Sequence, residues 1–380
     1  IKDFKFINEI FGMEKGNQVL IKQAKLMASN PSERTICARL MNDRFALCLP
    51  REEFDEKRVA DSVKELQREF SGNSFHLHTY MGVYEIRDRD EAVSIMVDKA
   101  NIAADTIKNN YDCCVAYYDE HLLEISIEQR RLLGEFEPAL QKGEFVMYLQ
   151  PQVNRDGAAK GAEALVRWAH PSRGILTPYA FIDILENAGL IYKLDLYIWE
   201  KAAQKLAEWK EKGYGSYHIS VNISTKDFYI IDIYETFTGL INKYGIAASN
   251  LHLEITETTL MTDFEKNMNI IHKLQNVGFR VEIDDFGSGY SSLNMLKDIS
   301  ADVLKIDMGF LRKSENEVKG QDILESIITL AGKIGMDVIT EGVETKKQLD
   351  MLTMMGCHEF QGYYFSKPVP VSEFEEKYLV

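Results

Sequence analysis

The chain has 380 residues, of which 45% are hydrophobic and 27% charged, as in ordinary soluble globular proteins. This length exceeds a single ordinary core and suits two domains. The formal charge of −15 argues against binding long nucleic acid through a broad basic face, although bound cations would still allow a small phosphate-bearing ligand.

Residues 1–120 mix helical and strand periodicity. Apolar residues at three- and four-residue steps predict helices over 11–29, 60–70 and 90–110, and β-rich runs predict strands over 34–40, 45–50, 75–86 and 113–119. The first two strands flank a short turn at residues 41–44, which predicts a hairpin. We expect a small α/β domain, residues 1–120, with one central sheet.

The segment from about 120 to 145 is highly charged and helical in period. It lacks the β-rich runs found on either side. We interpret it as a connecting pair of helices, and we divide the chain into a first domain (1–120), a helical linker (121–143) and a second domain (144–380).

The second domain alternates apolar strands with amphipathic helices. Eight strands are predicted, at 145–153, 161–168, 217–224, 251–257, 279–286, 301–307, 336–342 and 359–365. Eight strands with intervening helices predict a TIM (β/α)8 barrel. The turn at 154–161 is too short for a crossover helix, so the first two strands should be antiparallel, which makes the barrel a modified one.

Acidic residues lie at the ends of successive predicted strands. TIM barrels build their sites at the carboxyl ends of the strands, so five carboxylates should converge there: Glu163, Glu254, Asp284, Asp285 and Glu341. Any one of them could be only a loop cap or a solvated charge, but five together favour a cation site. Oxygen ligands, with Asn222 beside them, favour Mg²⁺ or Mn²⁺ in a two-metal site suited to phosphodiester hydrolysis.

Lys305 lies inside one of these strands and has two interpretations. A lysine in a barrel strand can act as a Schiff-base nucleophile, which requires a depressed pKa. A mouth crowded with carboxylates would instead keep Lys305 charged. We favour a cation that orients the attacking water or stabilises phosphoryl charge, and a structural salt bridge is the simpler version of this placement.

A glycine-rich turn at residues 284–292 follows the strand that carries Asp284. Its backbone amides could cradle a phosphate, although a flexible lid is an equally good interpretation. Glu257, three residues after Glu254, is in a position to brace this turn.

These motifs resemble the EAL-domain family of cyclic di-GMP phosphodiesterases. The matching segments are EALVRW (163–168), SVNIS (220–224), LEITE (253–257), DDFGSGYSS (284–292), VLKID (303–307), EGVET (341–345) and QGYYFSKP (361–368). They cover roughly residues 130–378, and the one departure noted is a serine at 288 where threonine is usual. The resemblance implies a modified TIM barrel that linearises cyclic di-GMP to pGpG with Mg²⁺ or Mn²⁺.

The resemblance also implies roles for single residues. Glu163, Asn222, Glu254 and Asp284 would hold one metal ion, and Asp284, Asp285 and Glu341 the other. The catalytic residues would be Glu341 as general base, Lys305 beside the attacking water, and Glu163. Contacts to substrate or support of the site are implied for Gln150, Leu165, Arg167, Asp285 and Gln361, and Glu257 would brace the loop.

Residues 1–120 resemble a GGDEF domain, the cyclic di-GMP synthase module, but with a degenerate signature. The defining loop reads Met41-Asn42-Asp43-Arg44-Phe45, so bulkier residues replace two glycines and Arg44 replaces an acid. Asn17 stands where an aspartate reads guanine, and Ser32 and Thr35 stand where a product-inhibition site would have arginine and aspartate. We expect a regulatory or dimerising module, not a cyclase, with GTP binding left open.

The leading hypothesis is therefore an active cyclic-guanylate-specific phosphodiesterase, and the alternative is a receptor that binds cyclic di-GMP without cleaving it. Family barrels often pair through the region after the glycine-rich turn, which favours a homodimer by analogy. Five cysteines without a CxxC pair, and no apolar run of membrane-spanning length, lead us to expect a cytoplasmic location. Because the chain begins at Ile1, we expect it to be a fragment of a longer protein, with membrane anchoring of that protein left open.

Overall fold

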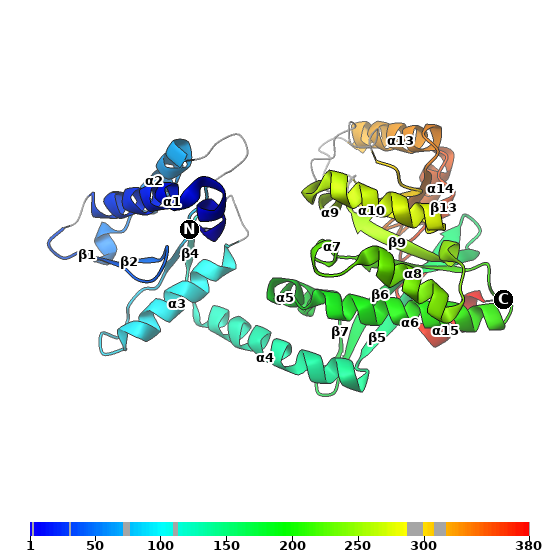
Figure 1. The fold of residues 1–380 in the computed structure, drawn as a ribbon, viewed down its shortest axis with the longest axis horizontal. Coiled ribbons are helices and arrows are strands. Elements are labelled where there is room, and N and C mark those ends of the chain that lie inside the picture. Colours follow the sequence, from blue (N-terminus) through cyan, green and yellow to red (C-terminus); the bar gives the residue numbers. More distant parts are fainter. Residues whose placement is uncertain are drawn as a thin grey trace. The chain divides into compact units, whose positions relative to one another are not determined.

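The protein is described here from a computed structural model. The described residues are 1, 4–29, 32–70, 77–108, 113–286, 299–307 and 317–379. They form two compact units, Ile1–Arg131 and Leu132–Val380, drawn as ribbons in Figure 1.

The first unit contains short strands and three longer helices. Its elements are α1 (Phe4–Ala28), β1 (Ile36–Arg39), β2 (Phe45–Cys48), η1 (Arg51–Glu53), α2 (Glu56–Phe70), β3 (Met81–Val83), α3 (Val93–Thr106) and β4 (Val115–Tyr117). The hairpin prediction is confirmed, since β1 pairs antiparallel with β2. The expectation of one central sheet is wrong for the described residues: β3 pairs only with β4, in parallel, and the two pairs stay separate.

The connecting segment is a single helix, α4 (Glu120–Lys142), and not the predicted pair. Its last turns belong to the second unit, where Leu132, Phe136 and Ala139 are buried in the hydrophobic core. Burial of this apolar face explains why the helix continues past Gly134, a residue with low helix propensity.

The second unit is a closed barrel with short additions. Its elements are β5 (Phe145–Asn154), β6 (Ala159–His170), β7 (Gly174–Leu176), η2 (Pro178–Ala180), α5 (Ile182–Ala188), α6 (Ile191–Glu211), β8 (His218–Ile223), α7 (Asp227–Ile230), α8 (Ile233–Tyr244), η3 (Ala248–Asn250), β9 (Leu251–Thr256), α9 (Glu257–Thr262), α10 (Phe264–Val277), β10 (Val281–Phe286), β11 (Val303–Asp307), α13 (Glu317–Lys333), β12 (Asp337–Glu341), α14 (Lys346–Met354), β13 (Glu359–Phe360), β14 (Val369–Pro370) and α15 (Val371–Tyr378).

The eight predicted barrel strands are all present. They follow one another as β5-β6-β8-β9-β10-β11-β12-β13 and close by pairing of β13 with β5. All neighbours from β6 to β13 in the barrel are parallel, whereas β5 runs antiparallel to β6, β13 and the short strand β14. The turn between β5 and β6 is tight because Gly157 adopts φ +83, a left-handed conformation that suits glycine. The predicted modified barrel is therefore confirmed.

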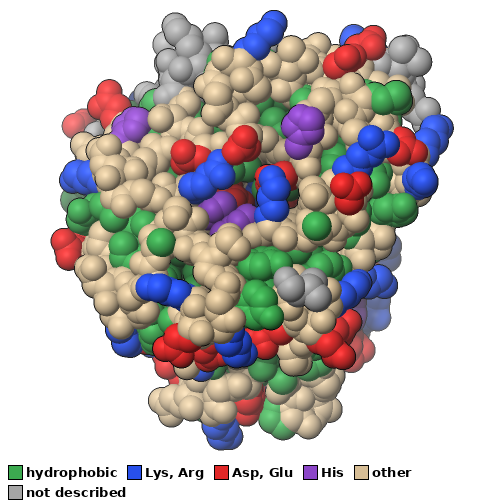
Figure 2. All heavy atoms as spheres, turned by 90° about the vertical axis from the view of Figure 1, so that its right-hand side faces the viewer, with side chains coloured by type: hydrophobic (Ala, Val, Ile, Leu, Met, Phe, Trp, Pro, Cys, Tyr) green, Lys and Arg blue, Asp and Glu red, His purple; other side chains and the backbone are tan. Residues whose placement is uncertain are grey.

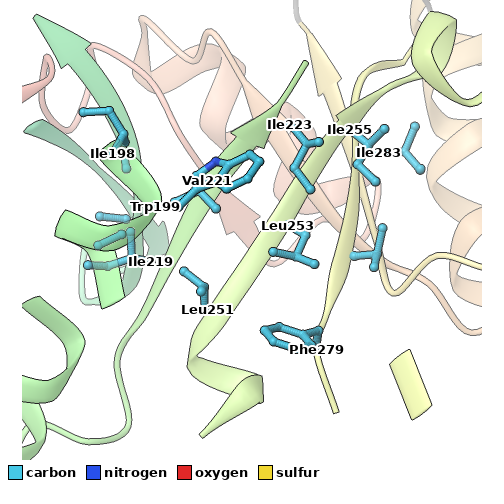
Figure 3. Close-up of a cluster of buried hydrophobic side chains, with 14 of the residues drawn as sticks. Ile198, Trp199, Ile219, Val221, Ile223, Leu251, Leu253, Ile255, Phe279 and Ile283 are labelled. Atoms are coloured by element: carbon cyan, nitrogen blue, oxygen red, sulfur yellow. The ribbon is translucent and has the colours of Figure 1, made fainter. Parts of the chain in front are cut away.

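Side chains alternate between the two faces of each barrel strand. The outward residues of β8 and β9 are apolar and packed beneath helices; Figure 3 shows Trp199 of α6 beside Val221, with Leu253 on the next strand. The inward residues are unusually polar, because TIM barrels normally fill this space with branched apolar side chains. On β8 to β10 they are His218, Ser220, Asn222, His252, Glu254, Glu282 and Asp284.

Among the described residues, no helix is long and apolar enough to cross a membrane.

Candidate active site

A buried lysine forms the centre of the acidic mouth. Lys305 of β11 is 1% exposed, and its Nζ lies 2.6 Å from an oxygen of Glu341 and 2.8 Å from one of Glu254. Its distances to carboxylate oxygens of Asp284 and Glu163 are 3.2 and 3.3 Å. Four of the five carboxylates that the strand-end pattern predicted to converge therefore do so, from four different strands, around one ammonium group.

Electrostatics in this cluster oppose the Schiff-base interpretation of Lys305. Burial alone would lower the pKa of Lys305, but the charges of Asp284, Glu163, Glu254 and Glu341 outweigh it and hold the pKa well above its ordinary value. A nucleophilic lysine needs the opposite shift. The raised pKa therefore favours a charged Lys305 over a nucleophilic one.

Two of the acids are held back from ionising. Burial, and then the charge of Glu163, raises the pKa of Glu254 well above its usual value. Burial also raises the pKa of Glu341 to about 8, even though Lys305 opposes the shift. Both shifts have the same physical cause, since one ammonium cannot balance four carboxylates in a poorly solvated space.

Amide side chains position Glu163 at the rim of the cluster. Asn222 of β8 donates to Glu163 Oε1 across 3.2 Å, and Gln361 donates to Glu163 Oε2 across 2.5 Å. Gln361 also donates to Gln150 Oε1 at 3.2 Å. The antiparallel β5 makes this possible, because its register places Gln150 directly opposite Glu163. Both glutamines are buried, so their hydrogen bonds fix the carboxylate.

The donor set fits divalent cations that prefer oxygen. Glu254 is fully buried, and its Oε2 has neither a hydrogen bond nor an ion pair within the described part of the chain. A buried carboxylate oxygen without a partner is costly, and a cation would compensate for it. Oxygen atoms from Glu163, Glu254, Asp284 and Glu341, with the carboxamide of Asn222, are ligands that Mg²⁺ and Mn²⁺ accept.

Asp285 lies beside the cluster, not in it. Its backbone has φ 56, an uncommon value for a residue other than glycine, and its side chain is exposed. Burial of part of the carboxyl, with the charges of Asp284 and Asp307, raises its pKa.

Asp307 is a residue for which the sequence suggested no role. It ends β11 opposite Glu341 on β12. The strand-end rule that selected the other acids applies equally to Asp307, so the sequence could have identified this residue as a candidate.

The residues expected to contact substrate follow Glu163 along β6. Leu165 and Arg167 are two and four residues further on, so they share its face at the carboxyl end of the strand, and both are half-buried. The Arg167 guanidinium lies 5.5 Å from the ring centre of Tyr148 and donates to the Val166 carbonyl. Arg167 has no ion pair with the four carboxylates, which leaves its charge available to a phosphate.

One part of the expected site is outside the described residues. The turn at 287–292, the region after it through which the resemblance implies pairing, and any brace from Glu257 to that turn therefore stay predictions. Glu257 itself begins α9 directly after β9 and is half-buried.

The signature turn of the first unit is closed by its own side chains. Asn42 has φ 56, and its carbonyl accepts two hydrogen bonds from the Arg39 guanidinium, at 2.7 and 3.1 Å. Asn17 is exposed.

The pair at the expected inhibition site is likewise occupied by a contact within the chain. Ser32 and Thr35 both donate to Glu53 Oε2, at 2.7 and 3.1 Å. An acidic partner here is the opposite of what an anionic ligand needs.

The fold and site together define an α/β barrel whose mouth is a cluster of carboxylates around one buried lysine. Comparison with known proteins names the class: the EAL domain family model matches residues 134–368, and the model for the diguanylate cyclase GGDEF domain matches residues 1–112. The chain therefore belongs to the EAL-domain family and carries a GGDEF domain at its N-terminal side.

Similar proteins include cyclic di-GMP enzymes. The bifunctional diguanylate cyclase/cyclic di-GMP phosphodiesterase MucR of Pseudomonas aeruginosa is 30% identical over 380 residues, covering 97% of this chain and 55% of MucR. The cyclic di-GMP phosphodiesterase PdeR of Escherichia coli is 26% identical over 382 residues, covering all of this chain and 58% of PdeR. The chain thus spans about half the length of these curated relatives.

Solved structures agree on the barrel. The PaMucR phosphodiesterase in complex with c-di-GMP superposes with a TM-score of 0.61 at 33% identity, covering 64% of this chain and 99% of that one. The EAL enzyme Bd1971 in its cAMP- and cyclic-di-GMP-bound form also gives 0.61, at 31% identity, covering 66% of this chain and 69% of that one.

Proposed function

We propose that the barrel hydrolyses cyclic di-GMP to linear pGpG with two Mg²⁺ or Mn²⁺ ions. The observation that supports this most is the convergence of four carboxylates on Lys305, with one buried oxygen of Glu254 left without a partner. An acidic mouth repels a phosphodiester unless cations reverse its sign. The similarity to the c-di-GMP complex of PaMucR supports the choice of substrate.

Glu163, Asn222, Glu254 and Asp284 would hold one ion, and Asp284, Asp285 and Glu341 the other. When bound, the ions would activate a water molecule and neutralise charge on the phosphate. Asn222 and Gln361 keep Glu163 in one orientation through their hydrogen bonds. This orientation is fixed before ligand arrives, which lowers the cost of assembling the site.

Two residues would move or stabilise charge. The Lys305 ammonium stabilises negative charge that develops at the reacting phosphate and its nucleophile. Glu341, which would also hold the second ion, is the candidate general base. Arg167, Leu165, Gln150 and Gln361 would line the approach of the substrate.

The alternative is a receptor that binds cyclic di-GMP without cleavage. The presence of every carboxylate in the cluster favours the enzyme, because a receptor does not need them. The deciding assay uses the full chain, cyclic di-GMP, and Mg²⁺ or Mn²⁺, with separation of pGpG from substrate. Turnover that stops on addition of EDTA is the expected result, and tight binding with no product would establish the receptor.

Glu163→Gln tests the ligand assignment in the same assay. It removes a charge from the proposed metal site but keeps the side chain's size, and we expect loss of turnover by at least about 100-fold. Glu344→Gln is the matched control, since Glu344 is an exposed acid three residues after Glu341. Full activity of Glu163→Gln would show that the ligand set is wrong.

For the first unit we propose a regulatory role without cyclase activity. The Arg39 bonds to the Asn42 carbonyl close the turn over which a nucleotide would lie. Incubation of the full chain with GTP should therefore give no cyclic di-GMP. If GTP changes neither the rate nor the affinity of the barrel for cyclic di-GMP, nucleotide control by this unit is excluded.

A further inference from the structure

A second polar cluster lies inside the barrel near the amino ends of the strands. His218 begins β8, and His252 and Glu282 are the second residues of β9 and β10. All three point inward from adjacent parallel strands, and each offers a ligand atom within 4.8 Å of the other two. They are separate from the carboxylates around Lys305, which lie further along the same strands.

His252 has an acceptor beside each ring nitrogen. Its Nε2 lies 3.2 Å from the Ser249 carbonyl, and its Nδ1 lies 2.6 Å from Glu282 Oε1. A neutral ring carries one hydrogen, so it can donate to only one of these oxygens. With that hydrogen on Nε2, the contact from Nδ1 to Glu282 is bridged by a second proton, on the ring or on the carboxyl, or by a metal ion.

The remaining members of the cluster also have free ligand capacity. His218 Nε2 lies 2.7 Å from Gln152 Oε1, and donation to this oxygen leaves its Nδ1 with a lone pair. Glu282 is fully buried, and its Oε2 has no hydrogen-bond partner within the described ranges.

The cluster opens into a cavity through which an ion can enter. The cavity has a volume of about 560 Å³ and is lined by His218, His252 and Glu282, with Lys160, Arg280, Asp337 and Glu359 among its other residues. Figure 2 shows this face, with histidine side chains in a hollow surrounded by basic and acidic groups. Lys160 pairs with Glu359 and Arg280 with Asp337, so these charges balance one another at the rim.

We propose that His218, His252 and Glu282 bind a divalent transition-metal ion of the zinc type. Two imidazoles and one carboxylate are a donor set that zinc uses, with a fourth position left for water from the cavity. The nitrogen donors distinguish this site from the oxygen-rich cluster around Lys305, which selects Mg²⁺ or Mn²⁺.

The surroundings supply the orientation that such a site needs. Gln152 holds the far nitrogen of His218, the Ser249 carbonyl holds that of His252, and the Ser220 hydroxyl donates to Glu282 Oε1 at 3.2 Å. The two rings are stacked with centroids 3.9 Å apart. The ring planes are 4° from parallel, so their in-plane lone pairs run side by side, and at least one ring must rotate out of the stack for both Nδ1 atoms to bind one ion at about 2 Å.

The test is metal binding by the full chain, with no reliance on turnover. Chelator-treated protein in excess Mg²⁺ is titrated with Co²⁺, which reports nitrogen ligation by its visible absorption, and Zn²⁺ is then added as competitor. We expect about one Co²⁺ per chain, displaced by Zn²⁺, and binding at least about tenfold weaker in Glu282→Gln and His252→Asn. His272→Ala, a change at an exposed histidine, and Glu163→Gln should both bind Co²⁺ as the wild type does.

Three results would overturn the proposal. The first is that the wild type binds neither Co²⁺ nor Zn²⁺ in excess Mg²⁺. The second is that folded Glu282→Gln binds the ion with unchanged affinity. The third is that Glu163→Gln loses binding, which would place the ion at the carboxylate cluster. Circular dichroism checks that each variant folds. If the variants of the cluster do not fold, X-ray absorption at the zinc edge of the loaded wild type decides, because imidazole scattering supports the site and its absence refutes it.

Discussion

Replacing Lys305 with methionine removes the only cation in contact with the four carboxylates among the described residues. Methionine has a similar length but no charge, so packing is largely kept. The four carboxylate oxygens that lie 2.6 to 3.3 Å from Nζ then face one another without compensation. Removing one partner of a buried ion pair costs about 3–5 kcal/mol. We expect the metal-free barrel to lose stability by this amount.

The assay is urea unfolding in EDTA, followed by tryptophan fluorescence. The three tryptophans, Trp168, Trp199 and Trp209, are all buried in the barrel, so the signal reports this unit alone. Lys243→Met is the matched control: it removes an exposed lysine that pairs with Glu200, and it should cost no more than about 1 kcal/mol.

A divalent cation should partly restore the variant. Mg²⁺ or Mn²⁺ supplies positive charge to the same carboxylates, so the ion should stabilise Lys305→Met more than it stabilises the wild type. Equal unfolding midpoints for Lys305→Met and the Lys243→Met control in EDTA would refute the reasoning, because Lys305 would then not be needed to balance the charge of the four carboxylates.

Three further changes probe other parts of the molecule. Leu253→Ala leaves a cavity at a fully buried position and should cost about 2–5 kcal/mol in the same urea assay; a loss below about 1 kcal/mol would contradict the packing. Burial and the charge of Asp227 raise the pKa of Asp195, and burial raises that of Asp227 to about 6. An acid whose pKa is raised in the folded state stabilises the fold while it is protonated, and this contribution is lost as pH rises through the folded-state pKa. The free energy of unfolding of the wild type should therefore fall from about pH 4 to about pH 7, and it should fall less in Asp195→Asn. The same slope in both proteins would contradict this prediction. Gly82→Ala would place a Cβ 1.7 Å from the Ala100 carbonyl oxygen, so it should destabilise the first unit by at least about 1–3 kcal/mol, seen as faster hydrogen exchange in β3 with barrel amides unchanged.

Local patterns determined the architecture of the second unit. Each barrel strand is encoded by its own apolar run, and the turn at Gly157 is too short for anything but an antiparallel hairpin. The acids of the mouth were also predictable, because the carboxyl end of every parallel strand faces the same side. These inferences need only neighbours in sequence and the direction of the chain.

The partners of those acids were decided by closure of the barrel. Across the barrel interior, Lys305 on β11 contacts Glu163 on β6, which is 142 positions away in sequence. Gln361 contacts Gln150, which is 211 positions away. No spacing rule specifies such contacts, since they depend on the tilt of the strands and the size of the ring. The same holds for His218, His252 and Glu282, which have no motif.

The first unit shows the opposite balance. Its helices follow from periodicity, and its hairpin follows from a turn. The pairing of β3 with β4 and no other strand depends on which strands lie beside them among the described residues. The strand propensity of residues 75–86 does not specify these neighbours. In this protein the sequence by itself predicted the barrel strands and the acids that gather at the barrel mouth. Only the tertiary structure decided which of these residues touch, because those contacts join strands that are distant in the chain.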